Sequence, residues 1–460
     1  MGVSTQTLDA GWAALKRSIM YYRGKAVGTV AACDETVDPL NYDQCFTRDF
    51  AVSAIAFLLR GETEIVRHFL EITLELQSRE RRMNYFKPGP GVMPASFKVV
   101  HDGNEEHLDS DFGEQAIAKV APIDAVFWWL ILLKLYTSAS GDTAFAQQWN
   151  VQKGIRYILD LCLTNRFDLF PTLLVPDGSF MIDRRMGVYG YPLDIQVLFF
   201  GALRAARSLL RPSSENILYA KAVSERITNL TNYIRQYYWL DVDQLRQIYR
   251  YRYDEFGLTS DNHFNIYPDA IPPWLESWIT DNGGYFVGNV GPGQMDFRWF
   301  AQGNLLSIVV GLADKPEAHE ILNQVEGRWS DLVSAMPIKA CYPALEGRDW
   351  EIITGCDPKN TPWSYHNGGS WPFMLLWLAL AAMKLKRNAL AERALQLADK
   401  RLEADQWPEY YDGRCGRLIG KDARLFQTWT IAGFLASREL LNDPEKLSWF
   451  DFDNIMVTAH

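Results

Sequence analysis

Apolar and polar residues alternate with the period of an α-helix along most of the chain. Residues three or four positions apart share their polarity over many long segments, whereas the period-two alternation typical of strands is nearly absent. We therefore predict an all-α protein. Its helices are expected at residues 49–60, 64–78, 123–138, 144–163, 193–211, 215–240, 298–313, 315–334, 370–385, 387–403 and 426–441.

Two kinds of helix alternate in this series. The segments IQVLFFGALRAARSLL, after Asp194, and WPFMLLWLALAAMKL are apolar on nearly every side, whereas the following NALAERALQLADKRLE has a polar face. A helix that is apolar all round belongs inside a protein, and an amphipathic helix belongs outside. The alternation predicts a closed ring of six helical hairpins, an (α/α)6 barrel, with active-site loops at one rim.

The pattern shows no boundary between domains. No Pro-, Gly- or Ser-rich linker interrupts the helices, so we expect residues 1–460 to form one catalytic domain, with short flexible ends at about 1–10 and 446–460. The longest apolar runs, 126–136 and 373–383, are too short to cross a bilayer. The amino terminus lacks the basic and apolar pattern of a secretory signal. We expect a cytoplasmic protein with no membrane partner.

Composition and charge limit the possible partners. Hydrophobic residues make up 48% of the chain and charged residues 22%, an ordinary globular balance. The formal net charge of -10 argues against a nucleic-acid partner, because phosphate contacts need clustered Lys and Arg. The six cysteines form no CxxC pair, and no His or Cys cluster has metal-ligand spacing. We predict no metal and no cofactor, and a neutral substrate.

Unusual residues gather in the loops between the predicted helices. These loops combine aromatic, glycine and charged residues, and an apolar helix follows directly in several of them. If these loops meet at one rim of the ring, they form a pocket of the kind in which ligands usually bind. They are FTRDF (46–50), MIDRRMGVYGYP (181–192), GPGQMDFRWF (291–300), SYHNGGSWP (364–372) and QWPEYYDGRCGR (406–417).

Asp183 stands out among the acidic residues of these loops. Asp194 has a structural explanation, because Pro192 suits the first turn of a helix and a carboxylate there offsets the helix dipole. Asp183 instead precedes Gly187 and Gly190, which mark a turn. Either it pairs with a neighbouring arginine or loop amide, or it is functional.

Glu409 is the second candidate. It lies among Trp407, Pro408, Tyr410 and Tyr411, which would desolvate the acid if the rings fold over it, although an exposed turn glutamate is the alternative. Cleavage of a glycosidic bond needs two carboxyl groups on opposite sides of that bond. A ring fold can bring Asp183 and Glu409 into this arrangement.

Several of these motifs resemble one family of glycoside hydrolases. FTRDF, DFGEQAIAKVAP (111–122), MIDRRMGVYGYP, YWLDVDQLRQIYRYRYDEFG (238–257), YHNGGSWP and WPEYYDG are similar to motifs of the alkaline/neutral invertases, glycoside hydrolase family 100, of plants and cyanobacteria. The resemblance runs from about residue 10 to about residue 445. It implies a compact cyanobacterial-type member with an (α/α)6 barrel that hydrolyses sucrose to glucose and fructose with inversion, as a homo-oligomer.

The resemblance also implies roles for the two carboxyl groups. Asp183 of MIDRRMG takes the place of the general acid, and Glu409 of WPEYYDG that of the general base. Local sequence argues the other way. Arg184 and Arg185 would lower the pKa of Asp183 if they touched it, while aromatic cover would favour the protonated form of Glu409.

Other residues are candidates for contacts with sugar hydroxyls. Arg48 and Asp49 resemble the Arg–Asp pair that grips glucose in related helical-barrel glycosidases, and a structural ion pair at a helix start is the alternative. His366 is a further candidate, although it could instead pack against Trp363 or Trp371 in the core. The remaining predicted sugar contacts are Gln294, Asp296, Asn367 and Gln427.

Two other functions stay open from the residues alone. A sugar epimerase or isomerase could share the fold, but its proton transfers at carbon usually depend on histidines, and only His366 of the seven lies in an obvious site loop. A non-catalytic sugar-binding protein is the other alternative, and the presence of both Asp183 and Glu409 argues against it.

Overall fold

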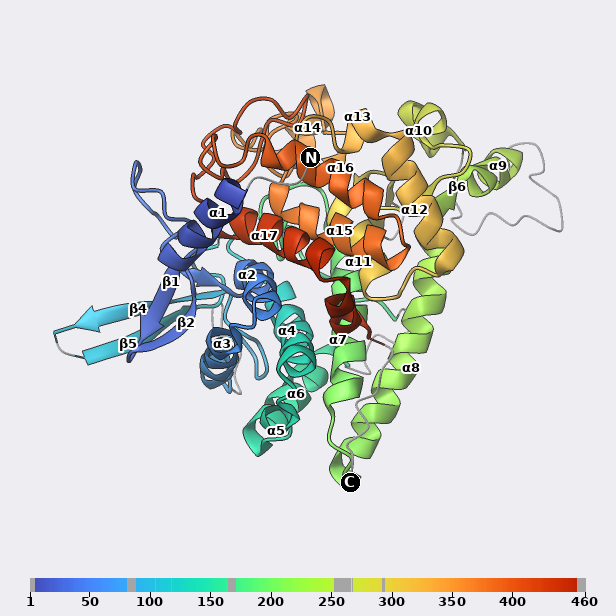
Figure 1. The fold of residues 1–460 in the computed structure, drawn as a ribbon. Helices are drawn as coiled ribbons and strands as arrows, with labels where there is room; N and C mark the ends of the chain where they lie inside the picture. The colour runs from blue at the N-terminus through green and yellow to red at the C-terminus, as the bar shows by residue number, and fades with distance from the viewer. Residues whose placement is uncertain are drawn as a thin grey trace.

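The computed structural model describes residues 5–80, 88–103, 105–116, 118–163, 171–251, 266, 268–291 and 294–452. Helices dominate this part of the chain (Figure 1). Its α-helices are α1 Thr5–Arg17, α2 Thr47–Leu59, α3 Thr63–Leu76, α4 Asp124–Ser140, α5 Thr143–Ala146, α6 Trp149–Cys162, α7 Leu193–Leu209, α8 Ser214–Tyr237, α9 Val242–Tyr251, α10 Pro273–Trp278, α11 Ala301–Val309, α12 Lys315–Gly327, α13 Trp329–Leu332, α14 Gly347–Thr354, α15 Leu375–Lys384, α16 Asn388–Asp399 and α17 Thr428–Asn442. Three short 3-10 helices, η2 Pro268–Ala270, η3 Pro372–Met374 and η4 Pro444–Phe450, complete the set.

Six helices close into an inner ring, in the order α2, α4, α7, α11, α15 and α17, with α17 packed back against α2. Outer helices pack on this ring, among them α1 on α17, α3 on α2 and α4, α8 on α7, α12 on α11 and α16 on α15 (Figure 1). This is the predicted (α/α)6 barrel. The inner helices are buried along nearly their whole length, as α7 illustrates, whereas only five of the 24 residues of the outer helix α8 are buried.

Aromatic and aliphatic side chains fill the middle of the ring, so that it has a core rather than a pore. Trp128 of α4 stacks on Trp377 of α15 with ring centroids 5.5 Å apart. Phe127 packs against Phe199 of α7 at 5.5 Å. The carboxyl-terminal segment covers the base, where the Lys384 ammonium donates to the Phe450 carbonyl at 2.9 Å. Among the described residues, this end of the ring is thus covered by the carboxyl-terminal segment.

The predicted helices are confirmed, with changes at their ends that have local causes. The segment 144–163 divides into α5 and α6, and 315–334 divides into α12 and α13. The segment 298–313 becomes helical only at Ala301, because Trp299–Phe300 pairs as a strand with Cys341–Tyr342. Helices α1, α9, α10 and α14 lay outside the prediction. The described parts of the two chain ends, expected to be flexible, are helical in α1 and η4.

Short strands are more numerous than the sequence pattern suggested. They are β1 Ile19–Tyr22, β2 Lys25–Thr29, β3 Cys45–Phe46, β4 Ser96–Asp102, β5 Glu105–Asp111, β6 Trp239–Asp241, β7 Gly284–Phe286, β8 Asn289–Gly291, β9 Gln294–Asp296, β10 Trp299–Phe300 and β11 Cys341–Tyr342. The longest pair, β4 and β5, forms a hairpin that projects from the ring (Figure 1). Strand β5 reads EEHLDSD, with polar residues on both faces, so it lacks the alternation that marks a half-buried strand.

No helix in the described ranges is long and apolar enough to cross a membrane.

Candidate active site

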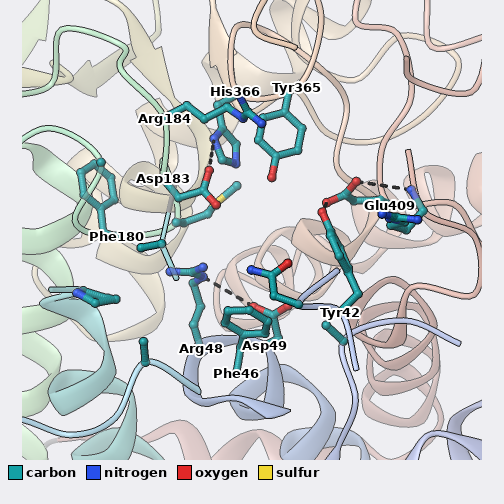
Figure 2. A pocket seen from close by; sticks show the side chains of 18 of the residues that line it. Tyr42, Phe46, Arg48, Asp49, Phe180, Asp183, Arg184, Tyr365, His366 and Glu409 are labelled. Carbon is teal, nitrogen blue, oxygen red and sulfur yellow. Dashed lines mark hydrogen bonds and ion pairs between the residues drawn. The ribbon is translucent and has the colours of Figure 1, made fainter. Parts of the chain in front are cut away.

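A cavity of about 680 Å³ opens at the rim of the ring opposite the base (Figure 2). This volume is in the range of small-molecule sites. Its walls come from segments far apart in sequence, including the start of α2, the loop before α7, and the loops before α15 and α17. Six of the residues predicted for the site line it: Arg48, Asp49, Asp183, His366, Glu409 and Gln427.

Asp183 lies in the loop before α7, as predicted, and faces the cavity. Its Oδ1 lies 3.5 Å from Nδ1 of His366. Arg184 turns away and places Nη1 2.9 and 3.0 Å from the two carboxylate oxygens of Asp357. Burial raises the pKa of Asp183 to about 6, against the positive charges of Arg48, Arg184 and Lys359, which lower it. The expected lowering by adjacent arginines is thus outweighed by loss of water around the carboxyl group.

Glu409 reaches the same cavity from the opposite side, and Figure 2 shows the two carboxyl groups turned toward the space between them. Its side chain is buried, and its Oε1 accepts a hydrogen bond of 2.7 Å from the Tyr42 hydroxyl. The Lys359 ammonium lies 3.5 Å from Oε2. The sequence suggested aromatic cover for this acid, and the structure adds a hydroxyl donor and a cation beside its two oxygens.

The aromatic neighbours of Glu409 support the loop from behind. Tyr410 is fully buried and stacks on Trp371 with ring centroids 5.4 Å apart. Tyr411 is also buried, and its hydroxyl donates to Asp405 at 2.9 Å. Their rings fix the backbone from which Glu409 projects.

Arg48 and Asp49 lie at the start of helix α2, which forms one wall of the cavity. The Arg48 Nη1 is 2.9 Å from Oδ2 of Asp124, and its Nε is 3.6 Å from Oδ1 of Asp49. Burial raises the pKa of Asp49 to about 7, although the neighbouring Arg48 lowers it. Donors and acceptors thus lie side by side here, as recognition of sugar hydroxyls requires.

His366 combines the two roles that the sequence left open. Its ring stacks on Trp371 with centroids 5.0 Å apart, and it also faces Asp183 in the cavity. Burial holds the pKa of His366 well below its usual range, and the nearby Arg48, Arg184 and Lys359 lower it further. The imidazole is therefore neutral at physiological pH.

Gln427 and Asn367 differ in placement. Gln427 lines the cavity just before α17, and with its amide oriented to satisfy both neighbours it donates to the Ala31 carbonyl at 2.9 Å. Asn367 is fully buried behind the wall. Its side chain accepts from the Leu345 N–H at 2.7 Å and donates to the Leu345 carbonyl at 2.9 Å. The structure thus brings Gln427 to the site and uses Asn367 to hold a neighbouring loop.

Asp296 lies outside the cavity. It lines a second hollow of about 1170 Å³, where it binds the Arg298 guanidinium through Nε at 2.9 and 3.0 Å. Gln294 belongs to strand β9, and its side chain lies outside the described part of the structure. Asp296 is therefore separate from the cavity that Asp183 and Glu409 share.

Asp194 has the structural role expected of it, through a different helix. It lies in the first turn of α7, but its Oδ1 accepts a 2.8 Å hydrogen bond from the Gly303 N–H, in the first turn of α11. Burial raises the pKa of Asp194 to about 7, although the Gly303 hydrogen bond lowers it. The carboxyl group ties two neighbouring inner helices together.

Sequence reasoning missed several residues that line the cavity. Asp124 is the first residue of the apolar helix α4. Like Asp194, it is an aspartate in the first turn of an apolar helix, and this pattern could have identified it. Tyr42 and Lys359 belong to loops without a distinctive pattern, so only the tertiary structure reveals their contacts with Glu409. Within the described residues, no group of three or more His, Cys, Asp or Glu side chains is arranged to hold a metal ion.

Comparison with known proteins agrees with this site. A family model described as alkaline and neutral invertase matches residues 11–444. The probable alkaline/neutral invertase D of Arabidopsis thaliana is 53% identical over 445 residues, which are 96% of this chain and 83% of that protein. Cytosolic invertase 1 of Oryza sativa subsp. japonica is 52% identical over 96% of this chain and 79% of its own length.

Solved structures share the fold at low sequence identity. The GH63 mannosylglycerate hydrolase from Thermus thermophilus, in complex with glucose, aligns with a TM-score of 0.58 at 12% identity, over 94% of this chain and 99% of that one. A glycosidase in complex with glucose aligns with a TM-score of 0.56 at 12% identity, over 97% of this chain and 100% of that one. The ring fold, the facing carboxyl groups and the relatives lead to one conclusion: the chain is a glycoside hydrolase and belongs to the alkaline and neutral invertase family.

Proposed function

We propose that the protein hydrolyses the glycosidic bond of sucrose with Asp183 as general acid and Glu409 as general base, and that the anomeric carbon of glucose is inverted. The observation that carries the proposal is the pair of carboxyl groups facing one cavity in different electrostatic surroundings. An acid and a base of this kind are what inverting glycosidases use.

The surroundings of Asp183 suit an acid. A pKa of about 6 leaves a useful protonated fraction near neutral pH, and the neutral His366 beside it adds no positive charge that would favour the carboxylate. In the reaction, Asp183 gives its proton to the bridging oxygen as the bond to the glucosyl carbon breaks. Fructose leaves with that oxygen.

The surroundings of Glu409 suit a base. The Tyr42 hydroxyl and the Lys359 ammonium each approach one of its oxygens, so that both neighbours can hold the carboxylate in a fixed position. The carboxylate removes a proton from a water molecule whose oxygen attacks the anomeric carbon from the side opposite fructose. One proton leaves Asp183 and one arrives on Glu409, so exchange with solvent restores the pair.

We place the glucosyl ring at the wall that carries Arg48 and Asp49, with His366 and Gln427 as further contacts. The guanidinium donates, and the carboxyl group of Asp49 can accept, so that this wall matches the hydroxyl groups of a pyranose. Asn367 and Asp296 are not assigned to the sugar, because their side chains serve other partners. We retain Gln294 as a proposed contact to a sugar hydroxyl.

An NMR time course of sucrose cleavage tests the mechanism. We expect β-glucose to appear first and to equilibrate with the α anomer later. Initial α-glucose would mean retention and would overturn the assignment of a base acting through water. Asp183→Asn and Glu409→Gln should each abolish turnover while sugar binding persists, and turnover retained in either variant would refute its role.

The alternative functions make different products. An epimerase would convert a reducing disaccharide to its epimer, and a sugar-binding protein would release no reducing sugar from sucrose. The low pKa and the stacking of His366 on Trp371 weigh against the first alternative, since the ring cannot readily accept and return a proton.

We also propose that the chain forms one domain, assembles as a homo-oligomer and works in the cytoplasm without nucleic acid or membrane partners. The continuous buried core supports one domain, and the net charge of -10 supports the absence of nucleic acid. Light scattering coupled to gel filtration tests the assembly; a monomeric mass would reject it.

A further inference from the structure

A short loop after helix α14, residues 356–360, reaches both sides of the catalytic cavity; we call it the bridging loop. On one side, Asp357 accepts hydrogen bonds of 2.9 and 3.0 Å from Nη1 of Arg184, the residue next to Asp183. On the other side, the Lys359 ammonium lies 3.5 Å from Oε2 of Glu409. One loop therefore contacts the segment that carries the acid and the side chain of the base.

The bridging loop is held firmly at both ends. The Asp357 Oδ1 accepts from the N–H of Lys359 at 2.9 Å and from that of Asn360 at 3.4 Å, which closes a turn. Asn360 is fully buried, and its side-chain oxygen accepts from the His366 N–H at 3.1 Å. The carbonyl of Asn360 accepts from the Trp350 indole at 2.7 Å. These contacts fix the backbone from which Lys359 extends.

The Lys359 side chain is confined as well. It is 15% exposed, and its ammonium lies 4.1 Å from the centre of the Tyr365 ring, so cation–π attraction and the Glu409 carboxylate act on it together. Within the described residues, Lys359 provides the cation of the ion pair with Glu409, which also faces the Tyr42 hydroxyl and the Arg424 N–H.

Lys359 also acts electrostatically on the other carboxyl group. Eight charged or titratable groups interact with Asp183 by contact or at longer range: Arg48, Arg184, Lys359, His366, Glu409, Asp49, Tyr42 and Tyr365. Arg48 belongs to the sugar wall and Arg184 is paired with Asp357, whereas Lys359 lies against the base. A single ammonium group thus lies 3.5 Å from Glu409 and also lowers the pKa of Asp183 at longer range.

We propose that Lys359 is a positioning residue that holds the Glu409 carboxylate toward the attacking water, and that Asp357 keeps Lys359 and Arg184 in place on the two sides of the cavity. The inference rests on the roles proposed for Asp183 and Glu409. A misplacement of about 1 Å in a catalytic group is enough to lower the rate about 100-fold. A lysine that only touched the sugar would affect substrate binding instead.

Kinetics of Lys359→Met and Lys359→Arg test this role, with Lys421→Met as the matched control. Lys421 is exposed and donates to the Pro358 carbonyl at 3.1 Å, so the control removes a lysine that contacts the same loop but not Glu409. For Lys359→Met we expect kcat to fall about 10- to 100-fold with KM changed less than about 3-fold. The alkaline limb of kcat/KM should also move to higher pH, because the pKa of Asp183 loses a cation that lowers it.

Lys359→Arg should restore the position of the alkaline limb and part of kcat, since it keeps the charge. Asp357→Asn keeps an acceptor for the turn but removes the negative charge that pairs with Arg184, and we expect about a 3- to 10-fold loss of kcat. Melting curves of all variants show whether they are folded at the assay temperature.

Two results would overturn the inference: an increase in KM alone with an unchanged pH profile for Lys359→Met, or wild-type kinetics for that variant. The controls separate this failure from that of the proposed function. If Asp183→Asn and Glu409→Gln are inactive while Lys359→Met is normal, the catalytic pair stands and only the positioning role falls. If either carboxyl variant turns over sucrose normally, the pair itself is misassigned.

Discussion

The two carboxyl groups that face the cavity, those of Asp183 and Glu409, lie in opposite kinds of surroundings. Asp183 has a neutral imidazole at 3.5 Å, and its neighbour in sequence, Arg184, is directed to Asp357. Glu409 has a hydroxyl donor at 2.7 Å and an ammonium group at 3.5 Å. Burial raises the pKa of Asp183 to about 6, whereas a hydroxyl donor and a cation lie beside the two oxygens of Glu409.

This difference is the reverse of what the adjacent sequence suggests. Two arginines follow Asp183, and aromatic residues surround Glu409, so local composition favours Asp183 as the ionised partner. In the structure these side chains have other partners. Arg184 forms an ion pair with Asp357, and Tyr410 stacks on Trp371 behind Glu409. The lesson is that charge near a residue in sequence is a poor guide to its pKa in a loop, where successive side chains diverge.

The largest expected effect comes from removing either carboxyl group, and two substrates whose leaving groups differ in their need for a proton distinguish the acid from the base. Asp183→Ala should lower kcat on sucrose by about 10²- to 10⁴-fold, yet it should retain activity on α-D-glucosyl fluoride, because fluoride leaves without a proton. Glu409→Ala should lose both activities, and added azide should restore cleavage of the fluoride as β-glucosyl azide. The opposite pattern, with azide rescuing Asp183→Ala, would exchange the two roles.

The pH dependence sharpens the same comparison. With Asp183 as the acid, kcat/KM should fall about tenfold per pH unit above its pKa of about 6, because the free enzyme must hold the proton. The corresponding limb of kcat should lie at higher pH, since bound sugar displaces water from the carboxyl group. Initial rates at low and saturating sucrose give the two profiles. A limb that rises with pH through this range would identify Asp183 as the base.

A smaller effect is expected from Tyr42→Phe, which removes the hydroxyl that donates to Glu409 and leaves the ring in place. Loss of one hydrogen bond to a charged group, about 1.5 kcal/mol, corresponds to a decrease of roughly tenfold in kcat, and KM should change little. Steady-state kinetics on sucrose measures both constants. An increase in KM alone would place Tyr42 in sugar binding rather than in support of the base.

The smallest effect concerns the ring beneath the site. The folded-state pKa of Asp194, about 7, is above that of an ordinary aspartate, so its contribution to stability is present at low pH and is lost as pH rises through about 7. Asparagine can still accept from the Gly303 N–H but does not titrate. The difference in Tm between Asp194→Asn and the wild type should therefore shift in favour of the variant by about 1–3 °C when the pH is raised from 5 to 8. A difference independent of pH would mean that Asp194 does not titrate in this range.

The helices of the ring could be predicted because each one carries its own periodic pattern, and the contrast between all-apolar and amphipathic helices specified inner and outer positions. The β4–β5 hairpin could not, because polar residues on both faces hide the strand period. Asn367 shows the same limit within the site: an asparagine beside two glycines suggested a sugar contact, and the structure places its amide on the Leu345 backbone.

The sequence by itself determined the helical ring, the family and the loops that carry the two carboxyl groups, since periodicity and motifs are properties of contiguous residues. Only the tertiary structure decided the charge around those groups. The contacts of Glu409 with Tyr42 and Lys359 span 367 and 50 positions, and that of Asp183 with His366 spans the distance between two loops. Burial and electrostatic fields depend on distances in space. When the ring of helices closes, it brings together loops that are far apart along the chain, so those distances cannot be read from the order of residues.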